Sequence, residues 1–209
     1  SKVIQPRKKI VRELYAKLTQ ANVTAIALTG ETDAGKSTLA SLIYHFAEAE
    51  RQAGRGYFTE KGLWLTISPT ITLSDVVHTL FTTQGQSVPE ITSYNRKTLL
   101  LKALNIAGVK RLVVLDQFEK WLGKETGELL EDHPGVSEWL DALNSKLSTS
   151  RVLLTTRSSI LNKLAHRSVH LQEYEVKGLE DEEAMELMRI FAPSRDDRDL
   201  RQVLSLIHI

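Results

Sequence analysis

Cysteine is absent from the 209 residues of this chain. This excludes disulfides and thiolate metal sites, and it suits a reducing compartment such as the cytosol. Long hydrophobic runs are also missing, because none approaches the roughly 20 apolar residues of a membrane-spanning helix. The sequence opens without the pattern of a secretory signal. From these absences we expect a cytoplasmic domain with no membrane partner.

An excess of charge of either sign is missing as well. The chain has 27 Lys and Arg against 26 Asp and Glu, for a formal net charge of +1. Such a balance gives no global electrostatic reason to expect nucleic acid as a direct partner. With 42% hydrophobic and 25% charged residues, the composition is that of a globular protein. The length suits one sizeable α/β domain, or one domain and part of another.

A glycine-bearing segment, Gly30–Thr38, carries the strongest chemical signal. It reads GETDAGKST and fits G-x-x-x-x-G-K-[ST], the phosphate-binding P-loop. An apolar, strand-like run at 23–29 precedes it, and an amphipathic helical pattern at 39–50 follows it. This is the strand–loop–helix setting that the motif requires, whereas an ordinary strand-to-helix turn is the alternative. The motif predicts that the chain binds a nucleoside triphosphate.

The residue types of this loop indicate how it would hold phosphate. Gly30 and Gly35 allow backbone conformations in which successive N–H groups face one anion. A helix beginning near Lys36 would point its positive end at the same phosphates. Lys36 is expected to contact the β- and γ-phosphates, and the Ser37 hydroxyl is expected to bind Mg²⁺. The other predicted nucleotide contacts in the loop are Asp33, Ala34 and Thr38.

Strand-like and helical patterns alternate along the rest of the chain. Further strands are predicted at 62–68, 111–116, 151–156 and 169–176, and further helices at 7–19, 72–81, 96–107, 136–147 and from 180 onward. Alternation of this kind favours a parallel sheet covered by helices. We therefore predict an α/β, three-layer P-loop NTPase fold with about five parallel strands flanked by helices.

Two acidic residues follow one of the predicted strands. Asp116 ends the apolar run 112–115, and an acidic strand end near a P-loop typically holds the magnesium shell. Glu119 is the carboxylate expected to orient or deprotonate the attacking water. Its alternative role is that of an exposed loop residue paired with Lys120 or Lys124.

Arg157 follows the next strand pattern, so we expect it at the same carboxyl edge of the sheet. An arginine there can pair with the γ-phosphate and so report its presence. A solvated arginine at a strand end is the alternative. Together with Lys36 and Glu119, Arg157 completes the predicted catalytic set.

With these pieces in this order, the chain resembles the STAND class of P-loop ATPases, specifically bacterial NB-ARC and NACHT-like domains, over about residues 3–203. The segments that carry the resemblance are GETDAGKSTLA at 30–40, WLTIS at 64–68, LVVLDQFE at 112–119, RVLLTTRS at 151–158 and GLEDEEAMEL at 178–187. The chain departs from the NB-ARC pattern at Thr32 and Asp33, where glycines are usual, and at Gln117, where a second acidic residue is common.

The resemblance implies an ATP/ADP-binding signalling switch with Mg²⁺ and slow ATP hydrolysis. Nucleotide exchange would drive oligomerisation of a larger regulator or defence protein whose effector and sensor domains lie outside this chain. Residues 1–177 would form the nucleotide-binding domain, and 178–209 the truncated beginning of a helical ARC-like subdomain. The alternative is an AAA+ motor or loader acting on nucleic acid, in which Thr155 or Thr156 would supply a polar residue at the strand end.

Overall fold

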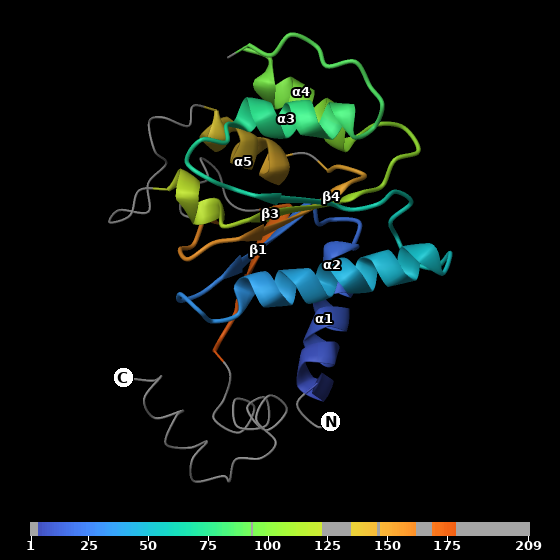
Figure 1. Cartoon of the computed structure of the whole chain (residues 1–209), viewed down its shortest axis with the longest axis vertical. Helices are drawn as coiled ribbons and strands as arrows, with labels where there is room; N and C mark the ends of the chain where they lie inside the picture. The colour runs from blue at the N-terminus through green and yellow to red at the C-terminus, as the bar shows by residue number, and fades with distance from the viewer. Residues whose placement is uncertain (1–3, 93, 123–134, 146, 162–168, 179–209) are drawn as a thin grey trace.

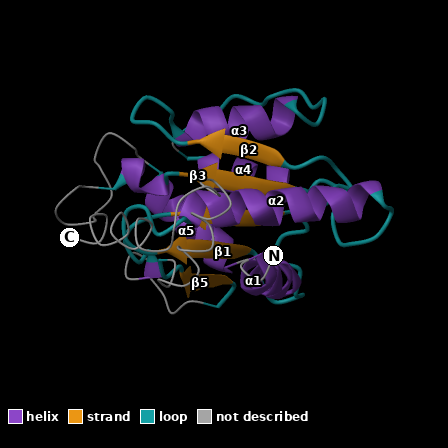
Figure 2. Ribbon diagram, turned by 60° about the horizontal axis from the view of Figure 1, so that its bottom comes forward, coloured by secondary structure: helices purple, strands orange, loops and turns teal. Residues whose placement is uncertain are grey.

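The computed structural model describes residues 4–92, 94–122, 135–145, 147–161 and 169–178. Five strands form one parallel sheet in the order β2-β3-β4-β1-β5, which confirms the predicted α/β fold (Figure 1). The strands are β1 (Ala25–Thr29), β2 (Leu63–Thr66), β3 (Leu112–Asp116), β4 (Arg151–Thr155) and β5 (Leu171–Glu175). Figure 2 shows their arrows pointing in one direction, so their carboxyl ends meet at one edge.

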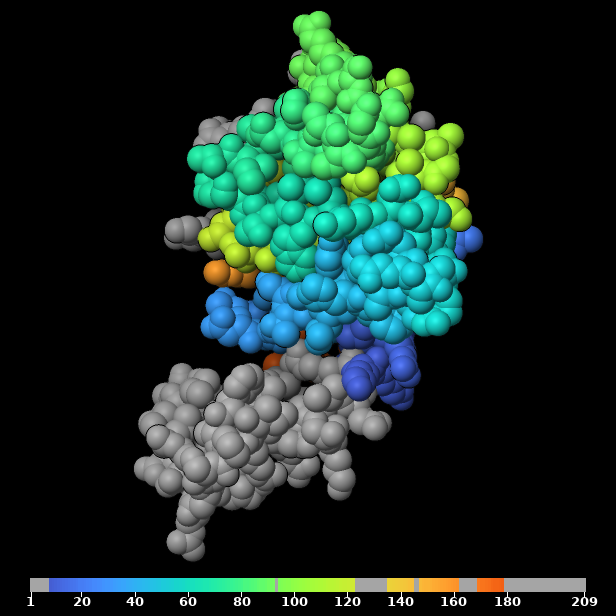
Figure 3. Space-filling view, turned by 45° about the vertical axis from the view of Figure 1, so that its right-hand side comes forward, coloured from blue at the N-terminus to red at the C-terminus, as the bar shows by residue number. Residues whose placement is uncertain are grey.

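Helices cover both faces of the sheet. They are α1 (Ile4–Leu18), α2 (Lys36–Gln52), α3 (Leu73–Thr82), α4 (Arg96–Leu104) and α5 (Val136–Ser145), with a 3-10 helix, η1 (Phe118–Trp121). The first two lie on one face, and α3, α4 and α5 lie on the other (Figure 1). In the space-filling view, the blue residues of α1 and the green residues around α4 lie at opposite ends of the described part (Figure 3).

The central strands are buried on both faces because their residues are apolar in succession. All five residues of β1, β3 and β4 are buried, as expected for parallel strands covered by helices. In β1, Ala25 and Ala27 face the core beneath α3, α4 and α5, whereas Ile26 and Leu28 face the core beneath α1 and α2. The edge strands β2 and β5 are less buried.

Several element boundaries differ from the sequence prediction. The helix expected over 96–107 ends at Leu104, because the side chain of Asn105 donates a 2.9 Å hydrogen bond to the Leu101 carbonyl oxygen. The side-chain amide oxygen of Asn105, Oδ1, accepts a hydrogen bond from the backbone N–H of Thr149 at 3.0 Å. Asn105 thus ends the helix and joins it to the segment before β4.

The predicted helix after residue 180 and the predicted subdomain over 178–209 fall almost entirely outside the described residues, as does Lys124. Within the described part, no helix combines the length and the apolar character that crossing a membrane requires.

Candidate functional site

Two glycines of the loop between β1 and α2 have backbone conformations that favour glycine. Gly35 precedes the first turn of α2 with a φ of 87°, in the left-handed region that glycine enters freely. Gly30 has a φ of 140°, and a Cβ on it would lie 2.5 Å from the carbonyl oxygen of Val176. Only glycine therefore fits at position 30.

Asp33 is also left-handed, with a φ of 63°. Aspartate tolerates this conformation better than most side chains, although a glycine would adopt it without strain. Its neighbour Ala34 turns its methyl group into the core beneath α1 and α2, and its N–H donates to the Glu31 carbonyl oxygen at 3.3 Å. Both residues are predicted to contact the nucleotide. Asp33 lines the cavity described below, whereas Ala34 does not.

The ammonium group of Lys36 lies against the carbonyl oxygens of the same loop. Its Nζ donates to the Gly30 oxygen at 2.8 Å and to the Glu31 oxygen at 2.6 Å. The residue is 8% exposed. This positive charge is therefore held at the loop itself.

Asp116 joins the loop to two strands. The Ser37 hydroxyl donates to its Oδ1 at 2.7 Å, although the two residues lie 79 positions apart in the chain. The Thr155 hydroxyl donates to the same oxygen at 2.6 Å and accepts from the backbone N–H of Gln117 at 2.8 Å. Thr155 and Asp116 are both buried. The sequence predicts that Ser37 and Asp116 lie together, but it does not predict the bridge through Thr155.

Glu119 and Arg157 form an ion pair. Arg157 Nε lies 3.4 Å from Glu119 Oε1, and the side chains are 54% and 18% exposed. Glu119 Oε2 is buried, and it finds no hydrogen-bond partner among the described residues. The partner of Glu119 is therefore an arginine from the neighbouring strand end, whereas Lys120, one alternative partner, faces the same cavity.

These residues surround one cavity of about 370 Å³ at the carboxyl edge of the sheet. It is lined by Thr32, Asp33, Gly35, Lys36, Ser37, Thr38, Gln117, Glu119, Lys120, Thr155 and Arg157. Three basic side chains meet two acidic ones there, with the α2 N-terminus at one wall. Such a lining suits a polyanion of phosphate size.

Ser37 and Asp116 are the candidates for holding a divalent cation. A hydroxyl and a carboxylate oxygen 2.7 Å apart are hard ligands of the kind Mg²⁺ prefers, so these residues fit the metal. The described residues contain no cluster of three or more His, Cys, Asp or Glu side chains that would bind a metal alone. A site of one carboxylate and one hydroxyl is typical of Mg²⁺ that is also bound by substrate phosphates.

The NB-ARC domain matches the chain over residues 7–198. No curated protein is similar enough in sequence to be a relative.

Solved structures with the same fold include ORC1 of Aeropyrum pernix in complex with DNA, at 18% identity and a TM-score of 0.60, with 90% of this chain and 49% of that chain covered. Drosophila ORC bound to DNA has 12% identity and a TM-score of 0.61, with 95% and 48% covered. The HORMA:CdnC:Trip13 complex of E. coli MS115-1 has 14% identity and a TM-score of 0.52, with 89% and 59% covered. The chain spans about half the length of the first of these proteins, and the likeness concerns the fold.

Proposed function

Because the chain belongs to the NB-ARC family of P-loop nucleotide-binding domains, we propose that it is an ATP/ADP switch of the STAND type. It holds ADP at rest and exchanges it for ATP when a larger regulator is activated. The observation that carries this proposal is a single cavity lined both by the P-loop residues Lys36 and Ser37 and by Arg157 from another strand end. That arrangement provides one set of contacts for both nucleotides and another that only a γ-phosphate reaches.

The P-loop supplies the contacts common to ADP and ATP. Backbone N–H groups of the loop and the N-terminus of α2 surround the β-phosphate. Lys36 exchanges its contacts with the Gly30 and Glu31 carbonyl oxygens for phosphate oxygens. The ammonium group needs little movement for this exchange, because it already lies against the loop.

Ser37 and Asp116 would hold Mg²⁺, which would neutralise charge on the phosphates. The hydroxyl of Thr155 fixes the orientation of the Asp116 carboxylate through its 2.6 Å hydrogen bond. Thr155 acts through Asp116 and is therefore a positioning residue.

Arg157 distinguishes ATP from ADP. In this structure its guanidinium pairs with Glu119. A γ-phosphate competes for the guanidinium, and the released Glu119 carboxylate accepts a hydrogen bond from the attacking water. Glu119 can act on the water only after the ion pair has separated, and we propose that hydrolysis is slow. The γ-phosphate shifts the switch only as far as it binds the two conformations differently.

The proposal extends beyond the described residues. Residues 1–177 form the nucleotide-binding domain, and 178–209 begin a helical ARC-like subdomain that responds to the bound nucleotide. ATP-bound copies associate with one another, and the effector and sensor belong to the rest of a longer protein.

The second candidate is an AAA+ motor or loader acting on nucleic acid. The observation that favours it is the hydroxyl of Thr155, a polar group at a strand end bonded to Asp116. Some proteins of the same fold are bound to DNA in their solved structures. Under this reading, added DNA would raise the rate of ATP hydrolysis, whereas under the switch reading the rate stays low and unchanged.

Two variants test the switch. Lys36→Ala should abolish binding of both MgADP and a slowly hydrolysed ATP analogue, measured by titration calorimetry. Arg157→Ala should leave ADP affinity within about twofold and lower affinity for the ATP analogue by roughly tenfold or more, the worth of a charge-assisted hydrogen bond. Equal losses for both nucleotides would contradict the role of Arg157.

Arg55→Ala is the matched control. Arg55 is another exposed arginine paired with a glutamate, Glu50, at 3.2 Å, but neither lines the cavity. Its removal should leave both affinities unchanged.

A further inference from the structure

The segment that carries Arg157 is held at both ends. At its start, the N–H of Thr156 donates to the Leu28 carbonyl oxygen at 3.0 Å, which continues the pairing of β4 with β1. Towards its end, Ile160 is fully buried in the same core as Ala25 and Ala27. The Arg157 side chain between them is half exposed, so packing does little to hold it, and the backbone sets the point from which it reaches Glu119.

Glu173 holds the far end of this segment. Its Oε1 accepts three hydrogen bonds: from the Ser159 hydroxyl at 3.0 Å, from the Ile160 N–H at 2.6 Å and from the Leu161 N–H at 3.1 Å. Hydrogen bonds to a carboxylate are about twice as strong as those between neutral groups. The carboxylate therefore anchors the chain two to four residues after Arg157.

The anchor reaches across the sheet. Glu173 belongs to β5, which pairs with β1, whereas Arg157 follows β4 on the other side of β1. Ala27 lies between them, in register with Glu173 on one side and with Leu154 on the other. The segment after β4 therefore packs near Ala25 and Ala27 of β1, and its backbone binds the carboxylate of Glu173 in β5.

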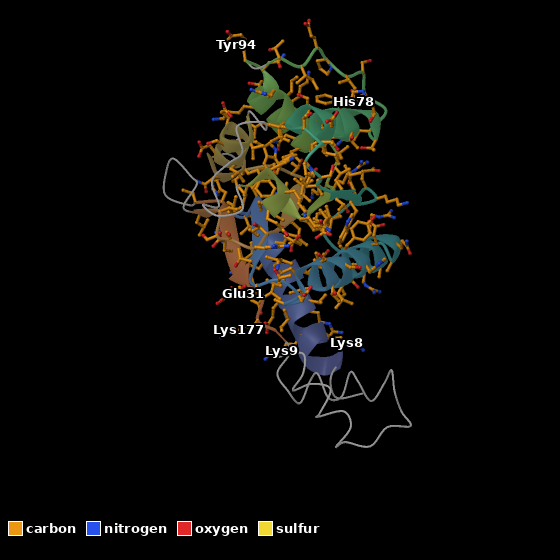
Figure 4. All side chains as sticks on the ribbon, turned by 60° about the vertical axis from the view of Figure 1, so that its left-hand side comes forward. Lys8, Lys9, Glu31, His78, Tyr94 and Lys177 are labelled. Carbon is orange, nitrogen blue, oxygen red and sulfur yellow. The ribbon has the colours of Figure 1, made fainter. Side chains whose placement is uncertain are left out.

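The same strand also contacts the P-loop. The N–H of Val176, just after β5, donates to the Thr29 carbonyl oxygen at 2.7 Å, and Gly30 lies directly against the Val176 carbonyl oxygen. In Figure 4 the labels of Glu31, in the loop, and Lys177, after β5, lie next to each other, in agreement with the contact between Gly30 and Val176. One strand therefore braces both the phosphate loop and the segment that carries Arg157.

We propose that Glu173 is a positioning residue for γ-phosphate recognition, because it fixes the backbone that presents Arg157 to the cavity. The inference rests on the proposed role of Arg157. A purely structural glutamate would support folding and the binding of both nucleotides equally. A positioning residue supports the preference for ATP over ADP.

The test compares Glu173→Gln and Glu173→Ala with wild type in the 209-residue chain. Affinities for MgADP and for a slowly hydrolysed ATP analogue are measured by calorimetry, alongside thermal unfolding. Glu173→Ala should lower the ratio of ATP-analogue affinity to ADP affinity by about threefold to tenfold, within the range of such indirect coupling. Glu173→Gln should have a smaller effect, because its amide oxygen still accepts hydrogen bonds without a charge.

Glu175→Ala is the matched control, since Glu175 lies two residues further along β5 and is exposed. It should leave the ratio unchanged. The double variant Arg157→Ala with Glu173→Ala should show the same ratio as Arg157→Ala alone, because both changes act on one contact.

The outcomes separate this inference from the proposed function. If Arg157→Ala lowers the ratio and the Glu173 variants do not, Glu173 is structural and the inference falls while the switch stands. Equal losses of both affinities in the Glu173 variants overturn the inference in the same way. If Arg157→Ala leaves the ratio unchanged, both are wrong. If Glu173→Ala does not fold, the test rests on Glu173→Gln. A ratio of ATP-analogue affinity to ADP affinity equal to that of wild type would then overturn the inference.

Discussion

Thr155→Val removes one hydroxyl from the centre of the candidate site and keeps the shape of the side chain. Thr155 is 1% exposed, so the valine methyl group occupies the same buried position. The change deletes the 2.6 Å hydrogen bond to Asp116 Oδ1 and leaves the Gln117 N–H without its 2.8 Å acceptor.

The expected cost follows from these two contacts. A hydrogen bond to a charged group contributes about 1.5–3 kcal/mol, and an unsatisfied buried donor costs about 1–3 kcal/mol. Gln117 is only partly buried, so we place the second contribution at the low end of its range or below. We expect the free energy of unfolding to fall by about 2–3 kcal/mol.

The assay is urea unfolding followed by the fluorescence of Trp121 and Trp139, both buried in the core. Thr156→Val is the control: Thr156 is equally buried, but its hydroxyl makes one 3.3 Å hydrogen bond to the Ser158 carbonyl oxygen. It should cost less than about 1 kcal/mol. Thr155→Ser keeps the hydroxyl and should recover most of the loss. Equal losses in the two valine variants would refute the bridging role of Thr155.

Two further changes test the phosphate loop and the fold. Gly30→Ala places a Cβ 2.5 Å from the Val176 oxygen, so urea unfolding should show a loss of more than about 2 kcal/mol; wild-type stability would contradict the loop geometry. Thr72→Ala breaks the capping box of α3 and should cost about 1 kcal/mol at pH 7. Hydrogen bonds from the backbone and hydroxyl of Thr72 lower the pKa of Asp75, so the part of this cost that comes from the hydroxyl donating to the carboxylate is present above the unfolded value near 4. That part disappears as the pH falls through the lower folded value, whereas the hydrogen bond from the Asp75 N–H to the Thr72 hydroxyl does not depend on the carboxylate charge. A cost at pH 2 as large as at pH 7 would argue against the contact with the carboxylate.

The sequence predicts the central strands and the phosphate loop well, because their signals are local. The runs that became β1, β3 and β4 are apolar except at their ends, and the P-loop motif fixes the start of α2. The carboxyl ends of parallel strands share one edge, so the meeting of Ser37 with Asp116 also follows from topology.

Contacts that depend on how distant segments cross could not be predicted in the same way. The bridge from Thr155 to Asp116 requires β3 and β4 to be neighbours in a known register. The contact of Glu173 with Ile160 requires the chain to pass β1 and reach β5, and no local pattern encodes that path. Glu119 and Arg157 likewise follow two different strands and pair with each other in the structure. In the sequence, each lies closer to other charged residues, so the sequence alone does not identify this pair.

The most direct test of the central claim identifies the nucleotide that stays bound through purification of the longest natural form of this chain. The protein is denatured, the released nucleotide is identified by chromatography, and ATP turnover is measured with and without DNA. The account predicts tightly held ADP and slow turnover that DNA does not change. An empty site with rapid, DNA-stimulated turnover would contradict the switch and favour the motor.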